Sequence, residues 1–425
     1  IKFTLYEKKY ILIPGLVILK KILIIGLNFY PEPTSTGKYT GELATYLCQQ
    51  GYPVHVITAP PYYPHWRVAE GYRAGCYTKE KWEKIEIFRC PLWVPRRPTG
   101  LTRLLHLASF ALSSLPMLTT QLHWKPDLIL CVAPTLMTAP GTLLLARLCK
   151  AKSWLHLQDF ELDAALGLGL LPVGRSLVRL AEWLERLLLN QFDRISTISK
   201  RMKVRLLEKG LPECKCTLLP NWVDTDQIYP LKGANPLRAA LKLPKSALVA
   251  LYAGNLGRKQ GLETVIETAR LLQNQTNLIF ILCGDGAARE ELEHTAEGLN
   301  NLRFLPVQPV EKLNQLLNLA DIHLLPQKTD AADLVMPSKL SGMLASGRAV
   351  IATSLADTEI GEVISQTGVL VPPEDAAALA GAILKLIKSP VVRTRLGKKA
   401  RTYALAQWSA TKILKKFGQH LNNLV

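Results

Sequence analysis

The chain has 425 residues, enough for two or three domains that each bury a hydrophobic core. Its 48% hydrophobic and 20% charged residues are typical of a folded globular protein and exclude a largely disordered one. The formal net charge of +18 favours an anionic partner: nucleic acid, an acidic membrane surface or a phosphorylated substrate.

Residues 1–18 are predicted to be an extension ahead of the first strand. The chain from residue 10 to residue 27 is apolar, but a proline, a glycine and two lysines interrupt it, which argues against a membrane-spanning helix. No cleavable signal peptide is recognisable at this end.

In the first half of the chain, short apolar runs alternate with longer amphipathic stretches, which is typical of a parallel sheet covered by helices. The predicted strands are 21–27, 53–59, 86–92, 127–133, 153–159 and 194–199. Helices are predicted between them, for example at 36–50, 101–122, 139–150 and 174–190.

The loop after the first strand reads NFYPEPTSTGKYTGEL and leads into a helix. The amides and the dipole at a helix start attract anions, Thr36 can cap the helix, and Gly37 lets the backbone approach a ligand. The glycines do not follow G-x-G-x-x-G, and the second strand ends without a carboxylate for a ribose diol, so a dinucleotide is not expected. A well-capped turn without a ligand is the alternative.

The predicted strand at 153–159 ends in the polar residues His156, Gln158 and Asp159. His156 and Gln158 share one face, because side chains alternate along a strand, and Asp159 begins the loop. A carboxylate or an imidazole at the carboxyl end of a strand can act as a catalytic group, and a structural hydrogen bond is the alternative for each.

The alternating pattern breaks at 218–231, and a polar connector precedes a second series. The second series has predicted strands at 248–254, 278–284, 302–307, 322–327, 349–354 and 368–373. We therefore expect an α/β protein with two Rossmann-like domains, 19–228 and 229–395, facing each other across a cleft, followed by a helical tail at 396–425. Ligands of such folds bind beyond the carboxyl ends of the strands. A single large α/β enzyme is the alternative.

The second domain begins with three glycines, Gly254, Gly257 and Gly261, around the cations Arg258 and Lys259. This loop follows a strand and precedes a helix, so it suits a pyrophosphate held by charge-assisted hydrogen bonds and helix amides. For the cation pair alone, a solvated turn is the alternative.

Further polar groups lie at three other turns. Ser338 and Lys339 start a predicted helix, where they can meet a phosphate or, in the case of the serine, only cap the helix. Asp285, in a CGDG turn, argues for capping. Asp224 and Asp226 have the spacing by which metal-dependent sugar transferases hold manganese, but they lie in the connector, so no metal site is expected.

Neither a nucleic-acid partner nor a disulfide framework is expected. The basic residues are dispersed, without a zinc-finger spacing or a strand typical of RNA recognition, which argues against nucleic acid. The eight cysteines are scattered, which favours a reduced, cytoplasmic setting over a disulfide framework.

Together these landmarks resemble the retaining GT-B glycosyltransferases of family four. That family has P-N-G-V-D in the connector, where this chain has PNWVD at 220–224, and LYAGNLGRKQGLE, CGDG, LADIHLLPQ, LASGRAVIAT and GVLVPPED follow in family order. Longer runs, among them GKYTGELATYL, HLQDFELDAALGLGL and DAADLVMPSKL, are similar to the WcaI-type transferases of colanic acid and related exopolysaccharides. The resemblance extends from about residue 21 to the C-terminus.

The resemblance implies a metal-independent transfer, with retention of configuration, from a nucleotide sugar to a lipid-linked saccharide on the cytoplasmic face of a membrane. No cofactor is implied, and the closer likeness suggests a GDP-sugar as donor. It also implies that the C-terminal helix crosses back to the first domain. The apolar stretch 101–125 and the amphipathic stretch 173–192 would let a basic first domain lie on anionic lipid, with core-covering helices as the alternative.

The chain departs from the family pattern at three places. The two family glutamates spaced E-x7-E align with Leu334 and Gly342, which leaves Asp333 as the nearest carboxylate. The arginine of the pyrophosphate loop aligns with Asn255, which leaves Arg258 and Lys259 as cations, and the active-site histidine aligns with Gln158.

The predicted site therefore has three groups of residues. The candidate catalytic residues are His156, Asp159 and Asp333. The candidate donor-diphosphate residues are Gly37, Lys38, Gly254, Asn255, Gly257, Arg258, Lys259, Ser338 and Lys339. The candidate acceptor-side or sugar-side residues are Tyr30, Thr36, Tyr39, Gln158 and Glu161. A GT-B-shaped epimerase or phosphorylase and a scaffold with a decayed site are the alternative functions.

Overall fold

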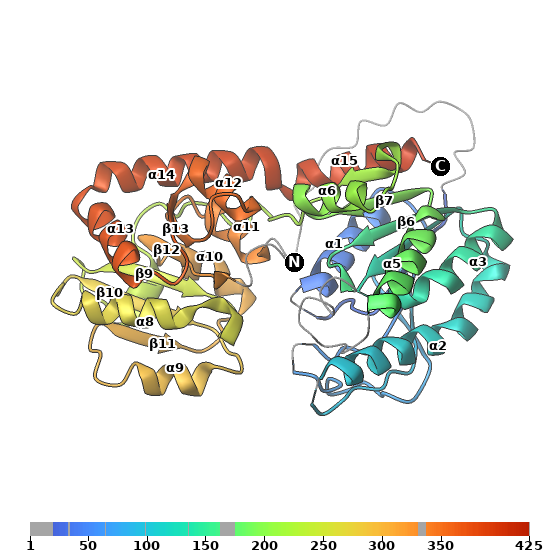
Figure 1. Cartoon of the computed structure of the whole chain (residues 1–425), viewed down its shortest axis with the longest axis horizontal. Helices are drawn as coiled ribbons and strands as arrows, with labels where there is room; N and C mark the ends of the chain where they lie inside the picture. Colours follow the sequence, from blue (N-terminus) through green and yellow to red (C-terminus); the bar gives the residue numbers. More distant parts are fainter. Residues whose placement is uncertain are drawn as a thin grey trace.

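The computed structural model describes residues 20–32, 35–63, 65–97, 99–134, 136–161, 175–329 and 337–424. The predicted extension at 1–18 and the candidate catalytic residue Asp333 lie outside these residues. Within them, the chain forms two α/β domains that lie side by side (Figure 1).

The first domain is built on an eight-stranded sheet in the order β3-β4-β2-β1-β5-β6-β7-β8. Its strands are β1 (Ile22–Gly26), β2 (Val54–Thr58), β3 (Thr78–Trp82), β4 (Ile85–Arg89), β5 (Leu128–Ala133), β6 (Lys152–Leu157), β7 (Arg194–Thr197) and β8 (Cys216–Leu218). Its helices are α1 (Ser35–Gln49), α2 (Gly100–Trp124), α3 (Ala139–Cys149), α5 (Arg175–Asn190) and α6 (Lys200–Glu208). Every residue of β1 and β5 is buried, as expected for strands covered by helices on both faces.

The six strands predicted for this domain all form. Two further strands, β3 and β8, escaped the sequence pattern. β3 has the sequence TKEKW and pairs antiparallel with β4 at the sheet edge, where both faces of a strand need not be apolar. β8 has only three residues.

The second domain has a six-stranded parallel sheet in the order β11-β10-β9-β12-β13-β14. Its strands are β9 (Leu248–Ala253), β10 (Leu278–Cys283), β11 (Leu302–Leu305), β12 (Ile322–Leu325), β13 (Ala349–Thr353) and β14 (Val369–Val371). Its helices are α7 (Pro236–Ala240), α8 (Leu262–Leu271), α9 (Arg289–Thr295), α10 (Leu313–Leu317), α11 (Ser338–Ala345), α12 (Glu359–Thr367), α13 (Ala376–Lys388) and α14 (Pro390–Tyr403). All six predicted strands form.

The strand order reverses once in each sheet, between β1 and β5 and between β9 and β12. Loops after the strands on either side of such a point leave in opposite directions and open a crevice, which is the usual ligand position in this class of fold. The loop after β1 and the loop after β9 are the two loops in which the sequence predicts phosphate contacts.

The C-terminal helix α15 (Ala410–Asn422) returns to the first domain, as the family resemblance implies. Phe417 of α15 packs on Trp154 of β6 with ring centroids 4.7 Å apart, and the hydroxyl of Tyr52 donates to Asn422 at 3.0 Å. α14 is a single helix across residues 395 and 396, where the tail was predicted to begin, and it packs on the second domain. The crossing itself occurs in the π-helical turn Ala404–Trp408.

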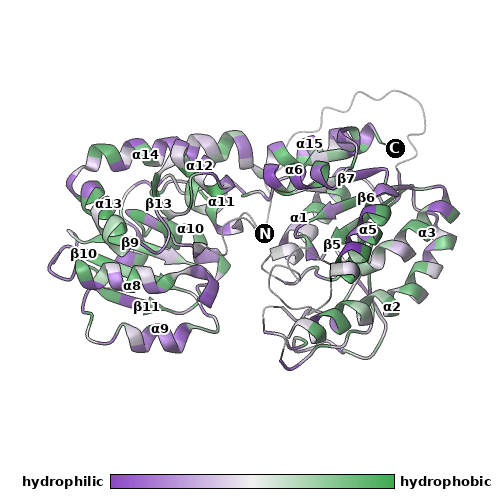
Figure 2. Ribbon diagram, viewed as in Figure 1, coloured by the Kyte–Doolittle hydropathy of each residue, from purple (hydrophilic) through white to green (hydrophobic). Residues whose placement is uncertain are grey.

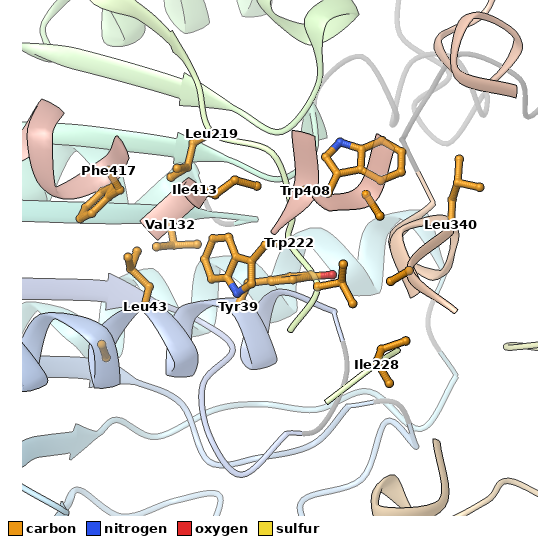
Figure 3. Packing of buried hydrophobic residues seen from close by; sticks show 14 of the residues in the cluster. Tyr39, Leu43, Val132, Leu219, Trp222, Ile228, Leu340, Trp408, Ile413 and Phe417 are labelled. Carbon is orange, nitrogen blue, oxygen red and sulfur yellow. The ribbon is translucent and has the colours of Figure 1, made fainter. Parts of the chain in front are cut away.

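One hydrophobic cluster joins the two domains. It contains Tyr39 of α1, Trp222 of the connector and Leu340 of α11, together with residues of α15. Figure 3 shows the ring of Tyr39 beside Trp222, pointing toward the helix that carries Leu340. Trp222, which stands where the family has glycine, donates its indole N–H to Glu42 of α1 at 2.6 Å, so the connector is anchored to the first domain.

Candidate functional site

The start of α1 and the start of α11 lie against each other. The hydroxyl of Tyr39, the fifth residue of α1, lies near the side chains of Ser338 and Ser341 on α11, and Tyr39 shares one hydrophobic cluster with Leu340 of the same helix. Burial raises the pKa of Tyr39 well above its usual value, so the phenol stays neutral. The N-cap position of α11 belongs to Pro337, so Ser338 does not cap the helix and its hydroxyl is available to this contact. The structure thus brings together two phosphate-binding segments that were predicted separately.

The first-domain wall of this site is shaped by Glu32, a residue that the sequence analysis did not single out. Glu32 is buried and accepts hydrogen bonds from the amides of Tyr62 and Tyr63, at 2.9 and 3.0 Å, and from the side chain of Asn28 at 2.8 Å. Burial raises its pKa, and these donors oppose that rise. A Cβ atom on Gly37 would lie 2.8 Å from the Cβ of Glu32 and 2.9 Å from its Oε2, so only glycine fits at position 37.

The other first-domain candidates vary in exposure. Lys38 is half-exposed, 3.8 Å from a carboxylate oxygen of Glu42 and 5.2 Å above the ring of Tyr39. The exposed ring of Tyr30 stacks on Trp82 with centroids 4.1 Å apart, which leaves one aromatic face for a saccharide. Thr36 is buried, so it is placed for packing rather than for contact with a ligand.

The surroundings of His156 favour the structural alternative over a catalytic role, which stays a prediction. Its Nδ1 hydrogen-bonds to Ser196 at 2.8 Å, and its Nε2 to the side-chain nitrogen of Gln158 at 2.9 Å. Burial lowers its pKa to about 4, so the imidazole is neutral at neutral pH. Both ring nitrogens are engaged within the protein, so His156 acts as a positioning residue for Gln158.

Gln158, which aligns with the family's active-site histidine, is held from two sides. Besides the contact with His156, it exchanges two hydrogen bonds with Asn221 of the connector, at 3.1 and 3.0 Å. Asp159 follows at the end of β6 and is half-buried, while Glu161 accepts the amide of Leu136 at 2.8 Å and so braces the loop after β5. Of the candidates on this strand, Asp159 is therefore the carboxylate best placed for chemistry.

In the second domain, the loop after β9 is braced by the CGDG turn. Gly254 and Gly284 both have positive φ, and a Cβ atom on Gly284 would overlap the carbonyl oxygen of Gly254. Asp285 accepts the amide of Gly286 at 2.8 Å with its side chain and the amide of Leu256 at 2.8 Å with its carbonyl. Asp285 therefore orders the turn, as its sequence position predicts.

The two cations of this loop lie on the surface, which differs from the pyrophosphate contact predicted for them. Arg258 and Lys259 fall in a short 3-10 turn that places both side chains in solvent. The side chain of Arg258 is 76% exposed and lies 3.3 Å from Glu291. Asn255 is also exposed, and its amide nitrogen lies against Gly257. The third residue of the turn, Gln260, is the one that faces inward.

Lys339 occupies the inner side of the same loop. Its ammonium donates to the hydroxyl of Tyr252 and to Oε1 of Gln260, both at 2.8 Å, and lies 4.3 Å from the ring centroid of Tyr252. Its Cδ and Nζ atoms lie 3.3 and 3.6 Å from the position that a Cβ on Gly254 would take. Burial lowers the pKa of Lys339 to about 7.

The aspartate pair of the connector forms a turn. Asp224 accepts the amides of Asp226 and Gln227 at 2.9 and 3.1 Å, which is the ordinary side-chain cap of such a turn. Across the residues that the structure describes, no three metal-ligating side chains gather into a cluster.

Comparisons with known proteins agree with this architecture. Residues 35–222 match the family described as a glycosyl transferase 4-like domain, and residues 247–389 match glycosyl transferases group 1. The chain is 43% identical over 406 residues to a putative colanic acid biosynthesis glycosyl transferase, WcaI, of Escherichia coli K12, covering 93% of this chain and 98% of that protein. It is 25% identical over 297 residues to a probable glycosyltransferase, WbjE, of Pseudomonas aeruginosa, covering 69% and 71% of the two chains.

Solved structures with the same fold include a sucrose-phosphate synthase of Thermosynechococcus elongatus, with a TM-score of 0.74 and 18% identity, covering 95% of this chain and 99% of that one. Another is HepE of Anabaena in complex with UDP-glucose, with a TM-score of 0.68 and 16% identity, covering 95% and 100%. These TM-scores and coverages show a shared fold.

Proposed function

The chain belongs to the GT-B glycosyltransferases, and we propose that it transfers a sugar from a nucleotide sugar to a lipid-linked saccharide in the synthesis of an exopolysaccharide such as colanic acid. WcaI of Escherichia coli, which matches 93% of this chain, is described as a putative colanic acid biosynthesis glycosyl transferase. This description supports an exopolysaccharide as the product. The UDP-glucose complex of a protein with the same fold supports a nucleotide sugar as donor.

One observation carries the proposal: Tyr39 of the first domain packs with Leu340 of the second in one buried cluster, beside Ser338 and Ser341. This contact places the Gly37 loop directly opposite the start of α11. An acceptor bound on the first wall would therefore lie beside a donor diphosphate bound at α11 and the loop after β9, as an intermolecular transfer requires.

Transfer with retention is part of the proposal. Glycosidases that retain configuration use a carboxylate nucleophile with an acid about 5 Å away. On the first wall, the carboxylates of Glu32 and Glu161 accept backbone amides, so neither is placed as a nucleophile. We therefore favour attack from the face of the leaving group, in which the departing diphosphate takes the acceptor proton and needs neither a nucleophile nor a metal.

We further propose that the first domain lies on the anionic cytoplasmic face of a membrane. α2 is long and apolar enough to cross a bilayer, and only 22% of its most apolar window is buried. In Figure 2 it carries apolar residues along its length. Its exposed stripe follows helical spacing and comprises Leu101, Leu105, Leu112, Leu115 and Leu122.

Cations flank this stripe. Arg97 precedes α2 and Lys125 follows it, and the neighbouring helix α3 adds Arg147 and Lys150, all four exposed. An apolar face bordered by basic residues is the composition that binds the surface of anionic lipid, and it would bring the enzyme to a lipid-linked acceptor.

The donor is identified by a thermal-shift screen of the purified chain against UDP-, GDP-, ADP- and dTDP-sugars. We expect a GDP-sugar to raise the melting temperature most, because a ligand at about 100 times its dissociation constant adds about 2.7 kcal/mol to the stability. Product analysis with and without a lipid-linked acceptor then separates the functions. An epimerase converts the donor alone, a transferase needs the acceptor, and a decayed scaffold does neither.

Membrane attachment is tested by flotation with neutral and anionic vesicles at low salt. We expect binding to the anionic vesicles only, and its loss in Leu112→Glu. Val391→Glu is the matched control, because Val391 is a strongly exposed apolar residue of α14 in the other domain. Equal binding by wild type and Leu112→Glu would remove α2 from the attachment surface.

A further inference from the structure

Lys339 is a cation enclosed by neutral groups. Its two acceptors are a phenol oxygen and an amide oxygen, and the phenol of Tyr252 itself donates to the carbonyl of Asn255 at 2.6 Å. No carboxylate contacts its ammonium among the described residues. An ammonium has three donors, so one remains for a further acceptor on the side of Gly254.

An enclosed ammonium without an opposite charge is costly to keep. Removing a charge from water costs several kcal/mol unless a partner repays it, and this cost is what lowers the pKa of Lys339. Uncharged residues of the same length would fill the space without this cost. We therefore expect Lys339 to form an ion pair with an anionic ligand.

The surroundings indicate the shape of that ligand. Gly254 leaves the loop backbone bare beside the ammonium. The loop follows β9, which adjoins the reversal of strand order between β9 and β12, the usual ligand position in this class of fold. A second polar atom at this edge, Oε1 of Gln327, is buried with no partner in the described part of the chain. The backbone of Gln327 packs against Gly261, the last residue of the same loop.

The other cations near the loop are engaged or remote. Arg258 pairs with Glu291 in solvent, Lys328 lies 3.2 Å from Glu263, and Lys259 is exposed. Among these side chains, the ammonium of Lys339 is the one directed into the loop.

We infer that Lys339 is the cation that binds the diphosphate of the donor, in place of the loop cations, and that Tyr252 and Gln260 are positioning residues that hold its ammonium beside Gly254. The inference rests on the proposed function and assigns its donor site.

The first test measures binding of UDP, GDP, ADP and dTDP by calorimetry to the full chain and to Lys339→Met, with the corresponding nucleosides as probes without phosphate. For the base that wild type binds, we expect Lys339→Met to lower diphosphate affinity about 10- to 100-fold, the range for one charge-assisted hydrogen bond, and to leave nucleoside affinity unchanged. Lys259→Met is the matched control and should bind as wild type does.

A charge-relocation variant sharpens the test. Because Gln260 Oε1 lies 2.8 Å from the ammonium of Lys339, a lysine at position 260 can deliver an ammonium to the same place. Gln260→Lys combined with Lys339→Met should recover most of the lost affinity, whereas a merely structural role of Lys339 predicts no recovery. Circular dichroism checks that each variant is folded.

Proton uptake provides a readout on the unaltered protein. Without a ligand, Lys339 has a pKa of about 7, so its amine is mostly unprotonated at pH 8. Binding of a nucleotide sugar should therefore make the protein take up most of one proton, which calorimetry detects as a binding enthalpy that depends on the buffer. The other groups facing Lys339 do not titrate there: Gln260 is neutral, and burial keeps the phenols of Tyr252 and Tyr39 protonated.

The outcomes separate the two proposals. If wild type binds none of the nucleotides, the proposed function fails. If it binds one of them and Lys339→Met binds it equally well, only the assignment of Lys339 is overturned.

Discussion

The two walls of the cleft have the same order of elements, a strand, a glycine-containing loop and a helix, but they treat enclosed charge in opposite ways. On the first wall, the carboxylate of Glu32 accepts three hydrogen bonds and fixes the loop before Gly37. On the second wall, the ammonium of Lys339 meets only neutral oxygens among the residues that the structure describes. A charge that the protein itself satisfies holds a loop in shape, whereas one left without an opposite charge is available to a ligand.

This comparison yields a rule for the site. Substitutions on the first wall should damage folding or transfer while nucleotide binding survives, and substitutions on the second should damage nucleotide binding first.

Glu32→Ala should cause the largest loss. It leaves the amides of Tyr62 and Tyr63 and the side chain of Asn28 without their acceptor inside the protein, at a cost of about 3–5 kcal/mol in the free energy of unfolding. Glu32→Gln is the matched control, because its amide oxygen still accepts both backbone amides and Asn28 can turn its own amide, so less than about 1 kcal/mol should be lost. Urea unfolding measures both, and equal losses would show that the negative charge, rather than the hydrogen-bond acceptor, holds the loop.

His156 should make stability depend on pH. Its pKa is lowered from about 6.5 in the unfolded chain to about 4 in the fold, so the unfolded chain binds more protons between these values and stability must fall as pH drops from 6.5 to 4. The loss is on the order of 3 kcal/mol and should be missing in His156→Gln, measured by urea unfolding at each pH.

The variant His156→Gln also tests whether His156 acts as an acid or a base in transfer. If the imidazole only positions Gln158, transfer by His156→Gln should keep the shape of its pH–rate profile, although its rate falls. Loss of one limb of the profile would restore His156 as an acid or a base.

Gly37→Ala should reduce transfer by about 100-fold, because the new Cβ must displace Glu32 or α1, and a shift of about 1 Å at a reacting centre has that effect. Gly41→Ala is the matched control. Its Cβ would meet the Cβ of Tyr30 at 3.5 Å, an ordinary contact, so its transfer rate should be nearly that of wild type. Both variants should bind nucleoside diphosphate as wild type does, and weaker binding by Gly37→Ala would move that residue into the donor site.

Glu359→Gln should have the smallest effect. Glu359 of α12 accepts the amides of Lys200 and Arg201 at the start of α6, at 3.0 and 3.2 Å, and so joins the outer faces of the two domains. Loss of the negative charge at the start of α6 should lower the free energy of unfolding by about 0.5–1 kcal/mol. Glu362→Gln is the matched control and should cost less, because it removes only an exposed ion pair with Arg201 at 3.9 Å. Unfolding and transfer assays check both, and transfer should be unchanged.

Much of the fold follows from local patterns. All twelve predicted strands form, and the two that were missed are a polar edge strand and a three-residue strand, neither of which has the apolar run by which strands are recognised. Gly254 and Gly257 also lie in the loop where the sequence places them, because glycine-rich turns between a strand and a helix are local features, whereas Gly37 is the third residue of α1.

The direction of side chains was less predictable. Arg258 and Lys259 have the composition of a phosphate site, but the turn that carries them exposes both, while the neutral Gln260 faces inward. His156 has the composition of a catalytic group, but its strand lies deep enough that Ser196 and Gln158 occupy both of its nitrogens. Neither outcome is encoded in spacing alone.

The sequence by itself determined the class of fold, the two domains and the family, because these depend on periodicity and on motifs within short segments of chain. Only the tertiary structure decided which charges meet. Lys339 lies 87 positions from Tyr252, and Tyr62 lies 30 positions from Glu32, so each contact depends on how separate elements pack. The free energy of a buried charge depends on neighbours that are distant in the sequence. For this reason the structure, rather than a motif, distinguishes the structural role of Glu32 from the ligand-binding role inferred for Lys339.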